Sequence, residues 1–388
     1  MTSPVASDLA IDRELASISE SFRFLVDVTP VNVEEARKEF LSSPDHEPAF
    51  EYREIEDFPA VIGARLAAVD IASVADPTLA QIFAAKRNEL LLQLKMLAVR
   101  GKPEFLDLSL ELYGTVTPDL ERRAEEILFE VPKARRARGR SLDAVTIARM
   151  AATELEGYRG AYPELSVAIE IRDDTSGVMV ANGALLIATS ACVISPRVNG
   201  LLAHEVGTHI LTYINGSLQH LKLMASGLAG YEETQEGLAL IGEAAVGGLT
   251  AGRLRQIAAR VIAVRRLLQG RSFVQTHREL TENYGYSKAG AFSIVMRVWR
   301  SGGFTKDAIY LRGLQDLVEY LSAGNELDCL WQGKMALSDL PLIRELTDRG
   351  VLAPPALLPN FLTDVTGRKR VERFASDAGL HVLIGADT

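Results

Sequence analysis

The stretch LLAHEVGTH, residues 201–209, places an HExxxH motif inside an apolar run. Two imidazoles with a carboxylate beside the first are the components of a hydrolytic zinc site, in which the histidines hold the metal and the glutamate activates water. We therefore predict that His204 and His209 bind Zn²⁺ and that Glu205 is the catalytic base. The alternative is that two ordinary histidines stand near an acid by chance. A match to a short pattern does not exclude it.

The spacing of the two histidines is incompatible with both rings lying on one face of a regular α-helix. On a regular helix, with ~100° per residue, side chains five positions apart point roughly 140° away from each other. One extra residue, accommodated as a π-bulge, would return both rings to one face, and such bulges are found often at functional sites. Gly207, inside the motif, tolerates that distortion best because it lacks a Cβ.

A second segment, TQEGLALIGE at residues 234–243, offers the remaining ligand. Catalytic zinc takes three protein ligands, and in many helical peptidases the third is a glutamate on a later helix. Glu236 lies among small and apolar residues, where a buried carboxylate needs a partner such as a divalent cation. Glu243, two helical turns further on, would orient a ligand histidine by accepting its hydrogen bond, unless it is a plain surface acid. His220 is an alternative ligand, although a lone histidine is more often packed or exposed.

HEVGTH followed by QEGLA resembles the QEGLA-motif family, the bacterial flavohaemoglobin expression-modulating proteins, which are similar to the microtubule-associated tyrosine carboxypeptidases. The resemblance runs from about Tyr162 to about Tyr320 and rests on both motifs at this separation. It implies a zinc metallopeptidase of carboxypeptidase type, acting on a peptide or protein C-terminus and removing tyrosine or another aromatic residue. His204, His209 and Glu236 match the family's metal ligands, and Glu205 matches its catalytic glutamate. The identity of the substrate does not carry over.

The hydrophobic pattern changes period along the chain. Residues 1–158 carry apolar side chains at helical spacing, and Thr117-Pro118 is typical of a helix start. After Pro163 the apolar residues alternate, and Asn182-Gly183 between apolar runs predicts a hairpin that leads to a helix capped by Ser195. We predict an α+β fold, mainly helical with a small antiparallel sheet and a zincin-like core. The expected domains are a helical one over 1–158 and a catalytic one over 159–388 with a helical C-terminal part.

Basic and aromatic side chains gather between residues 278 and 312. A carboxypeptidase needs a cation to pair with the terminal carboxylate and a donor to stabilise the oxyanion. The candidates for substrate binding are Arg297, Arg300, Lys306, Tyr284 and Tyr310, with Tyr286 and His277 as alternative donors. A salt-bridged helix surface would account for any single one of them. We expect at least one of the cations to reach the metal site.

Composition limits the partners. A formal net charge of −9 argues against nucleic acid, and no apolar run approaches the ~18–20 residues of a membrane span. The basic run at residues 133–140 is typical of a solvated loop. The N-terminus has no secretory signal pattern, and Cys192 and Cys329 do not suggest a disulfide framework, so we expect a cytoplasmic protein. The oligomeric state stays open.

Three other functions fit the same motif. A different HExxxH exopeptidase, such as a dipeptidyl-peptidase, would place an acidic group to bind a free amine, where a carboxypeptidase places a guanidinium. A non-enzymatic regulatory protein with a structural metal site would have no use for an unligated Glu205. Two histidines and one carboxylate also suit iron for oxygen chemistry, although a glutamate adjacent to the first histidine favours hydrolysis.

Overall fold

The fold is given by a computed structural model that describes residues 4–55, 58–133, 139–175 and 177–376. Helices dominate it, and the predicted α+β class, mainly helical with small sheets, is confirmed. Most of the predicted basic loop, residues 134–138, lies outside the described residues. The helices up to residue 158 are α1 (Ala6–Glu20), α2 (Phe24–Asp27), α3 (Val33–Ser42), α4 (Phe58–Ala68), η1 (Ile71–Ser73), α5 (Pro77–Ala98), α6 (Glu104–Tyr113), α7 (Pro118–Glu130) and α8 (Ala144–Tyr158).

The strands and the helices that carry the motifs follow. The strands are β1 (Ser141–Asp143), β2 (Ile169–Arg172), β3 (Val178–Ala181), β4 (Ala184–Ala188) and β5 (Cys192–Ile194). The later helices are α9 (Ser195–His204), η2 (Glu205–Ile210), α10 (Leu211–Ser217), α11 (Leu223–Ser226), α12 (Tyr231–Ala245), α13 (Ala251–Leu268), α14 (Phe273–Glu282), α15 (Lys288–Trp299), η3 (Arg300–Gly302), η4 (Thr305–Ala308), α16 (Ile309–Ser322), η5 (Asp328–Trp331), η6 (Leu337–Asp339), α17 (Leu340–Asp348), α18 (Asn360–Thr363) and α19 (Val365–Ser376).

The strands form two small sheets. β1 pairs with β5 in antiparallel fashion, and β4 lies between β2 and β3 in the other sheet. The predicted hairpin is confirmed: Asn182 and Gly183 both have positive φ, 48° and 75°, as a tight turn between β3 and β4 requires. The prediction of a purely antiparallel sheet is wrong for β2, which runs parallel to β4 because the chain reverses direction twice, once between β2 and β3 and once between β3 and β4. α9 begins at Ser195 itself, so Ile194 and not Ser195 occupies the N-cap.

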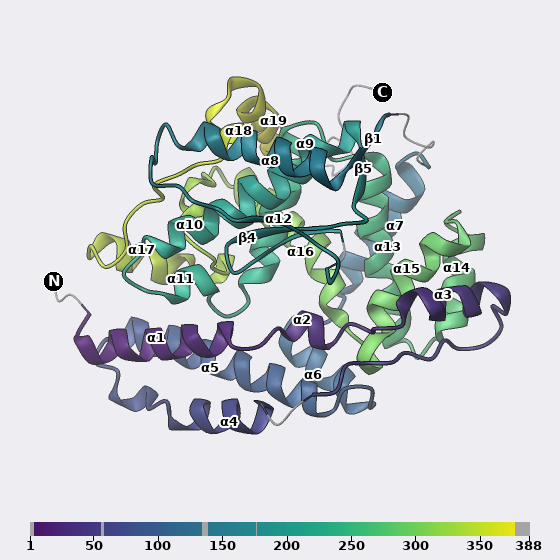
Figure 1. The fold of residues 1–388 in the computed structure, drawn as a ribbon, viewed down its shortest axis with the longest axis horizontal. Coiled ribbons are helices and arrows are strands. Elements are labelled where there is room, and N and C mark those ends of the chain that lie inside the picture. The colour runs from purple at the N-terminus through teal and green to yellow at the C-terminus, as the bar shows by residue number, and fades with distance from the viewer. Residues whose placement is uncertain (1–3, 56–57, 134–138, 176, 377–388) are drawn as a thin grey trace.

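The layers place the motif helices inside the molecule. In Figure 1 the helices α1, α4, α5 and α6 lie along the bottom, β4 lies in the middle, α8, α9, α18 and α19 lie along the top, and β1 and β5 lie at the upper right beside α9. Among the described residues, no helix is long and apolar enough to cross a membrane.

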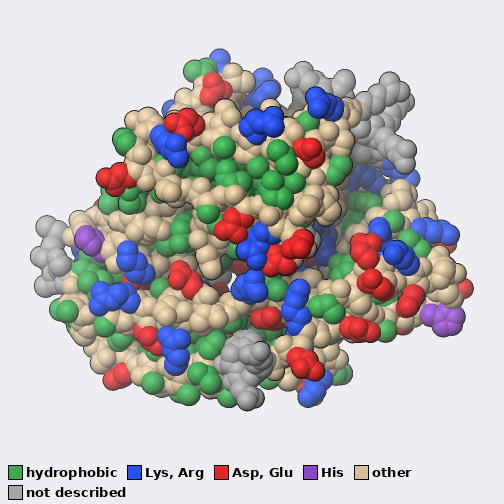
Figure 2. Space-filling view, viewed as in Figure 1, with side chains coloured by type: hydrophobic (Ala, Val, Ile, Leu, Met, Phe, Trp, Pro, Cys, Tyr) green, Lys and Arg blue, Asp and Glu red, His purple; other side chains and the backbone are tan. Residues whose placement is uncertain are grey.

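Figure 2 shows Lys, Arg, Asp and Glu side chains mixed about the middle of this face, so neither sign of charge forms a continuous patch there.

A small second core joins the N-terminal helices to the segment around η4. Phe24, Phe105 and Tyr113 pack there on Phe304, with ring centroids 6.1, 6.0 and 5.3 Å apart. The main core contains buried side chains from both predicted domains. We keep the division after residue 158 as a proposal.

The helix that carries QEGLA is held at very short range by α16. A Cβ on Gly237 would lie 2.5 Å from the carbonyl oxygen of Gly313, and one on Gly313 would overlap the carbonyl oxygen of Glu233. Glycine at both positions therefore lets the two backbones touch, and this contact sets the position of α12.

Replacing Gly313 with alanine is expected to lower the free energy of unfolding by ~1–3 kcal/mol, because the new methyl group forces α12 and α16 apart. Chemical denaturation measures the change. Gly157→Ala is the matched control, since a Cβ on this exposed residue of α8 meets nothing within 4 Å. Gly157→Ala should leave the free energy of unfolding unchanged or raise it by up to ~1 kcal/mol. Equal stability of the two variants would contradict the close-packing argument.

Candidate metal centre

The HExxxH motif forms a π-helical turn. η2 is a π-helix that interrupts the α-helical path between α9 and α10. The wider turn accommodates the extra residue between the histidines, and the ring centroids of His204 and His209 lie 5.0 Å apart. The distortion expected from the spacing is therefore confirmed, and both imidazoles lie on one side of the helix.

Side chains from distant segments support this turn. The indole Nε1 of Trp331 donates a hydrogen bond of 2.8 Å to the carbonyl oxygen of Gly207, and the hydroxyl of Thr208 donates one of 3.2 Å to the carbonyl oxygen of Ala203. These bonds satisfy carbonyl groups inside or next to the turn. Gly207 does not have a positive φ. Its missing Cβ instead leaves room for Phe361, whose ring carbon would lie 3.2 Å from it.

A third side chain converges on the two rings. Glu236, in the second turn of α12, completes a group in which one atom from each of His204, His209 and Glu236 lies within 4.8 Å of the others. Its Oε2 is 3.5 Å from Nε2 of His204, is buried, and has no hydrogen-bond partner among the described residues. An orphaned carboxylate oxygen facing two imidazoles fits a divalent cation, because the donor set is the one zinc prefers.

Glu243 fixes the orientation of His204. Its Oε1 accepts a hydrogen bond of 2.9 Å from Nδ1 of His204, which turns Nε2 toward Glu236. The carboxylate is almost fully buried and is also approached by Nε of Arg253 at 3.4 Å and by a guanidinium nitrogen of Arg197 at 3.7 Å. Glu243 is thus not the surface acid that the sequence left as an alternative, and its charge is balanced by two arginines that the sequence reading did not single out.

Replacing Glu243 with glutamine is expected to weaken zinc binding by about 10- to 100-fold, because the amide accepts a weaker hydrogen bond from the ligand histidine. Competition with a chromogenic chelator measures the affinity. Glu164→Gln, at an exposed position, serves as control. Unchanged affinity in Glu243→Gln would show that the hydrogen bond does not tune the histidine.

The electrostatics of the group favour a bound cation. Burial raises the pKa of Glu236, but the contact with His204 and the charge of Lys306 lower it by more, so the carboxylate is ionised. Burial and the charge of His204 lower the pKa of His209 to about 4, which leaves this ring neutral. Burial lowers the pKa of His204, yet the contact with Glu236 and the hydrogen bond with Glu243 raise it to about 10. The carboxylates that hold a proton on His204 would hold a metal ion in its place.

Glu205 stands beside the ligands without joining them. Its side chain is 7% exposed, and its carboxylate makes no hydrogen bond within the part of the chain that the structure describes. Burial raises its pKa to about 7, and the charge of His204 opposes this rise. A carboxylate with such a pKa can accept a proton near neutral pH and release it again.

The five predicted substrate-binding residues separate in space. Lys306 pairs with Glu232 at 3.2 Å. The charge of Glu236 contributes to the raised pKa of Lys306, Arg297 and Tyr310, so these three side chains are within electrostatic reach of a candidate ligand. Arg297 is held by two bonds of 2.6 Å to Asp307. Its side chain is still 31% exposed.

The other two predicted residues lie elsewhere. Arg300 donates to the hydroxyl of Thr29 at 2.7 Å and stacks on Phe304, so it faces the N-terminal helices. Tyr284 packs on Phe129 of α7, with ring centroids 5.8 Å apart. The structure does not bring Tyr284 to the ligands, because the turn after α14 faces α7. The alternative donor His277 is also engaged elsewhere, with its Nε2 donating to the carbonyl oxygen of Lys288 at 2.9 Å.

Two cations near the site were missed. Arg260 lies over the ring of Tyr310, 5.2 Å from its centroid, and the ammonium of Lys334 lies 5.2 Å from the centroid of Tyr213. Burial lowers the pKa of Lys334 to about 8. The signal for Arg260 was its position seven residues after Arg253, which puts both arginines on one face of α13. Lys334 lies in a loop, and its sequence context carries no signal.

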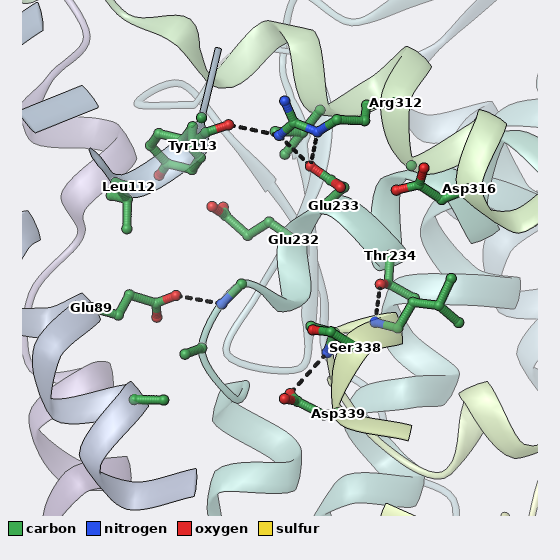
Figure 3. A pocket seen from close by; sticks show the side chains of 18 of the residues that line it. Glu89, Leu112, Tyr113, Glu232, Glu233, Thr234, Arg312, Asp316, Ser338 and Asp339 are labelled. Carbon is green, nitrogen blue, oxygen red and sulfur yellow. Dashed lines mark hydrogen bonds and ion pairs between the residues drawn. The ribbon is translucent and has the colours of Figure 1, made fainter. Parts of the chain in front are cut away.

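An acidic cavity of about 730 Å³ opens beside the first turn of α12 (Figure 3). Its carboxylates are Glu89, Glu232, Glu233, Asp316 and Asp339. Nε of Arg312 donates to Glu233 at 2.6 Å, and Glu89 accepts a bond of 2.7 Å from the backbone amide of Gly230. None of the three candidate ligands lines the cavity, so it is separate from the metal centre.

A family model described as "Microtubule-associated tyrosine carboxypeptidase" matches residues 38–379, which is nearly the whole chain. No curated protein matches the sequence.

Proposed function

Because the chain belongs to the microtubule-associated tyrosine carboxypeptidase family, we propose that it is a zinc-dependent carboxypeptidase with a zincin-like core. It would remove the C-terminal residue, tyrosine or another aromatic residue, from a peptide or protein. The observation that carries the proposal is the convergence of His204, His209 and Glu236, with an unpaired buried oxygen on Glu236 and an unligated Glu205 beside them.

The proposed chemistry divides between a metal and the side chains. His204, His209 and Glu236 would hold zinc, with Glu243 fixing the first ring. Bound zinc would supply a Lewis acid for the scissile carbonyl and lower the pKa of water. Glu205 would take a proton from the attacking water and deliver it to the leaving amine, which is the work of one carboxylate with a pKa near neutrality.

The small sheet supports a peptide as substrate. β3 is an edge strand, and it packs beside the π-helical turn η2. An extended peptide can add to such an edge through main-chain hydrogen bonds, with its side chains alternating between the two faces. A substrate held this way would present its backbone to the metal ligands whatever its sequence. The choice of the residue that is removed would then depend on contacts made by that residue, on the C-terminal side of the scissile bond.

The charges around the ligands favour a carboxypeptidase over a dipeptidyl-peptidase. A free amine needs an unpaired carboxylate near the scissile bond, whereas Glu232, the cavity carboxylate that reaches Lys306, is already paired with that lysine. Near Glu236 stand Lys306 and Arg297, which are cations suited to a terminal carboxylate. A purely structural metal site gives no role to Glu205.

The test is mass spectrometry of a mixed peptide library incubated with the zinc-loaded full chain, with Glu205→Gln as control. Loss of single C-terminal residues only with the native protein is the expected result. Loss of N-terminal dipeptides would favour the dipeptidyl-peptidase, and no cleavage of any peptide by a protein that binds zinc would count against a peptidase of broad substrate range.

A further inference from the structure

A buried cluster near the metal ligands carries more positive than negative charge. Its carboxylates, apart from the candidate metal ligand Glu236, are Asp307 and Glu232, and its cations are Arg260, Arg297 and Lys306. Arg260 and Lys306 are 7% and 4% exposed, and Asp307 is 1% exposed. Three cations against two carboxylates leave an excess of one charge, and buried charges without partners are costly.

The excess falls on one side chain. Asp307 gives both of its oxygens to Arg297, and Glu232 pairs with Lys306. Nε of Arg260 forms an ion pair with the same Asp307 at 3.6 Å, beyond hydrogen-bond distance, and has no hydrogen-bond partner among the described residues.

The terminal nitrogens of that guanidinium also make no hydrogen bond with any residue in the described ranges, although a guanidinium offers five N–H donors in a planar fork. Arg260 is therefore a largely buried cation that forms one long ion pair and no hydrogen bond.

Its location relates it to the metal ligands by two routes. Arg260 lies over Tyr310, 5.2 Å from the centroid of its ring, and burial together with the charge of Glu236 raises the pKa of that tyrosine, so Tyr310 interacts with both Arg260 and a candidate ligand. On α13, Arg253 lies two turns earlier on the same face and reaches Glu243, the carboxylate that holds His204. The face of α13 that carries Arg260 is therefore the face toward the metal centre.

The chemistry that fits this position is a carboxylate. We propose that Arg260 binds the terminal carboxylate of the substrate, with Tyr310 beneath the guanidinium as an aromatic wall. The proposal rests on the carboxypeptidase function above and names the group that selects a free C-terminus. The carboxylate would pair bidentately with the guanidinium, which balances the excess charge, whereas an amidated or internal residue would leave Arg260 unpaired.

The experiment compares one peptide in two forms. A pentapeptide ending in tyrosine, as the free acid and as the C-terminal amide, is titrated by calorimetry into the zinc-loaded Glu205→Gln full chain, which binds without turnover. The acid should bind about 10- to 100-fold more tightly than the amide. Adding Arg260→Gln should bring the ratio close to one, while Arg260→Lys, which keeps the charge but loses the fork, should give an intermediate ratio.

The control is Arg265→Gln on the same helix, where the arginine pairs with Glu121 at 2.8 Å. It should keep the native ratio. Zinc content and thermal unfolding show whether each variant is folded, and Arg260→Lys carries the test if Arg260→Gln is not. A ratio unchanged in the folded Arg260 variants, or equal binding of acid and amide before any change at Arg260, overturns the carboxylate site. If the library assay shows C-terminal cleavage while the acid-to-amide affinity ratio is unchanged in the Arg260 variants, the carboxypeptidase function is supported and the carboxylate site at Arg260 is not.

Discussion

Glu205→Gln is expected to lower kcat by about 10³- to 10⁴-fold without loss of zinc. Glutamine keeps the size of the side chain but cannot accept a proton, and Glu205 is not one of the three converging ligands. Release of the C-terminal residue by mass spectrometry gives the rate, and elemental analysis gives the zinc content.

The matched control is Glu164→Gln, which makes the same change at an exposed position. It should keep both activity and zinc. If Glu205→Gln lost its zinc along with its activity, Glu205 would be part of the metal-holding group and not the base. If it kept full activity, another group would have to move the proton.

Replacing a metal ligand is expected to remove the zinc, whereas replacing Glu205 is expected to leave it bound. His209→Ala and Glu236→Ala should each reduce bound zinc from about one ion per chain to almost none, because only two protein ligands remain at a site that needs three. Activity should fall with the metal. Circular dichroism controls for folding, since Glu236 precedes Gly237 in the tight contact between α12 and α16.

His220→Ala is the control for that pair, because His220 is exposed and lies between the two motifs without joining the ligand group. It should retain zinc. Full zinc occupancy in both His209→Ala and Glu236→Ala would place the metal somewhere else in the chain and would remove the basis of the proposed mechanism.

The part of the site that follows from the sequence is the part built from local spacing. His204 and His209 are five positions apart, a spacing that requires a helix wider than an α-helix if both rings are to share one face, and the structure has a π-helix there. Asn182-Gly183 specified a hairpin because both residues adopt positive φ easily, and the turn is present. Such features depend on backbone conformation over a few residues, which a single sequence records directly.

The support of the site could not be predicted, because it comes from contacts across the chain. Trp331 bonds to Gly207 from 124 residues away, and Phe361 packs against the same glycine, yet neither lies in a recognisable motif. Arg260 was hidden for a related reason. α13 carries several arginines, and composition does not tell which of them meets an acceptor and which is left unpaired.

The same long-range contacts determine the order in which parts of the metal centre can form during synthesis. A ribosome delivers the chain from its N-terminus, so His204 and His209 emerge well before Trp331 and Phe361, which complete the turn between the two histidines. A nascent chain therefore exposes its ligands before the turn can be braced. The turn between the histidines reaches its final shape only after Phe361 has been made, so a nascent chain that stops before this residue does not carry a finished site.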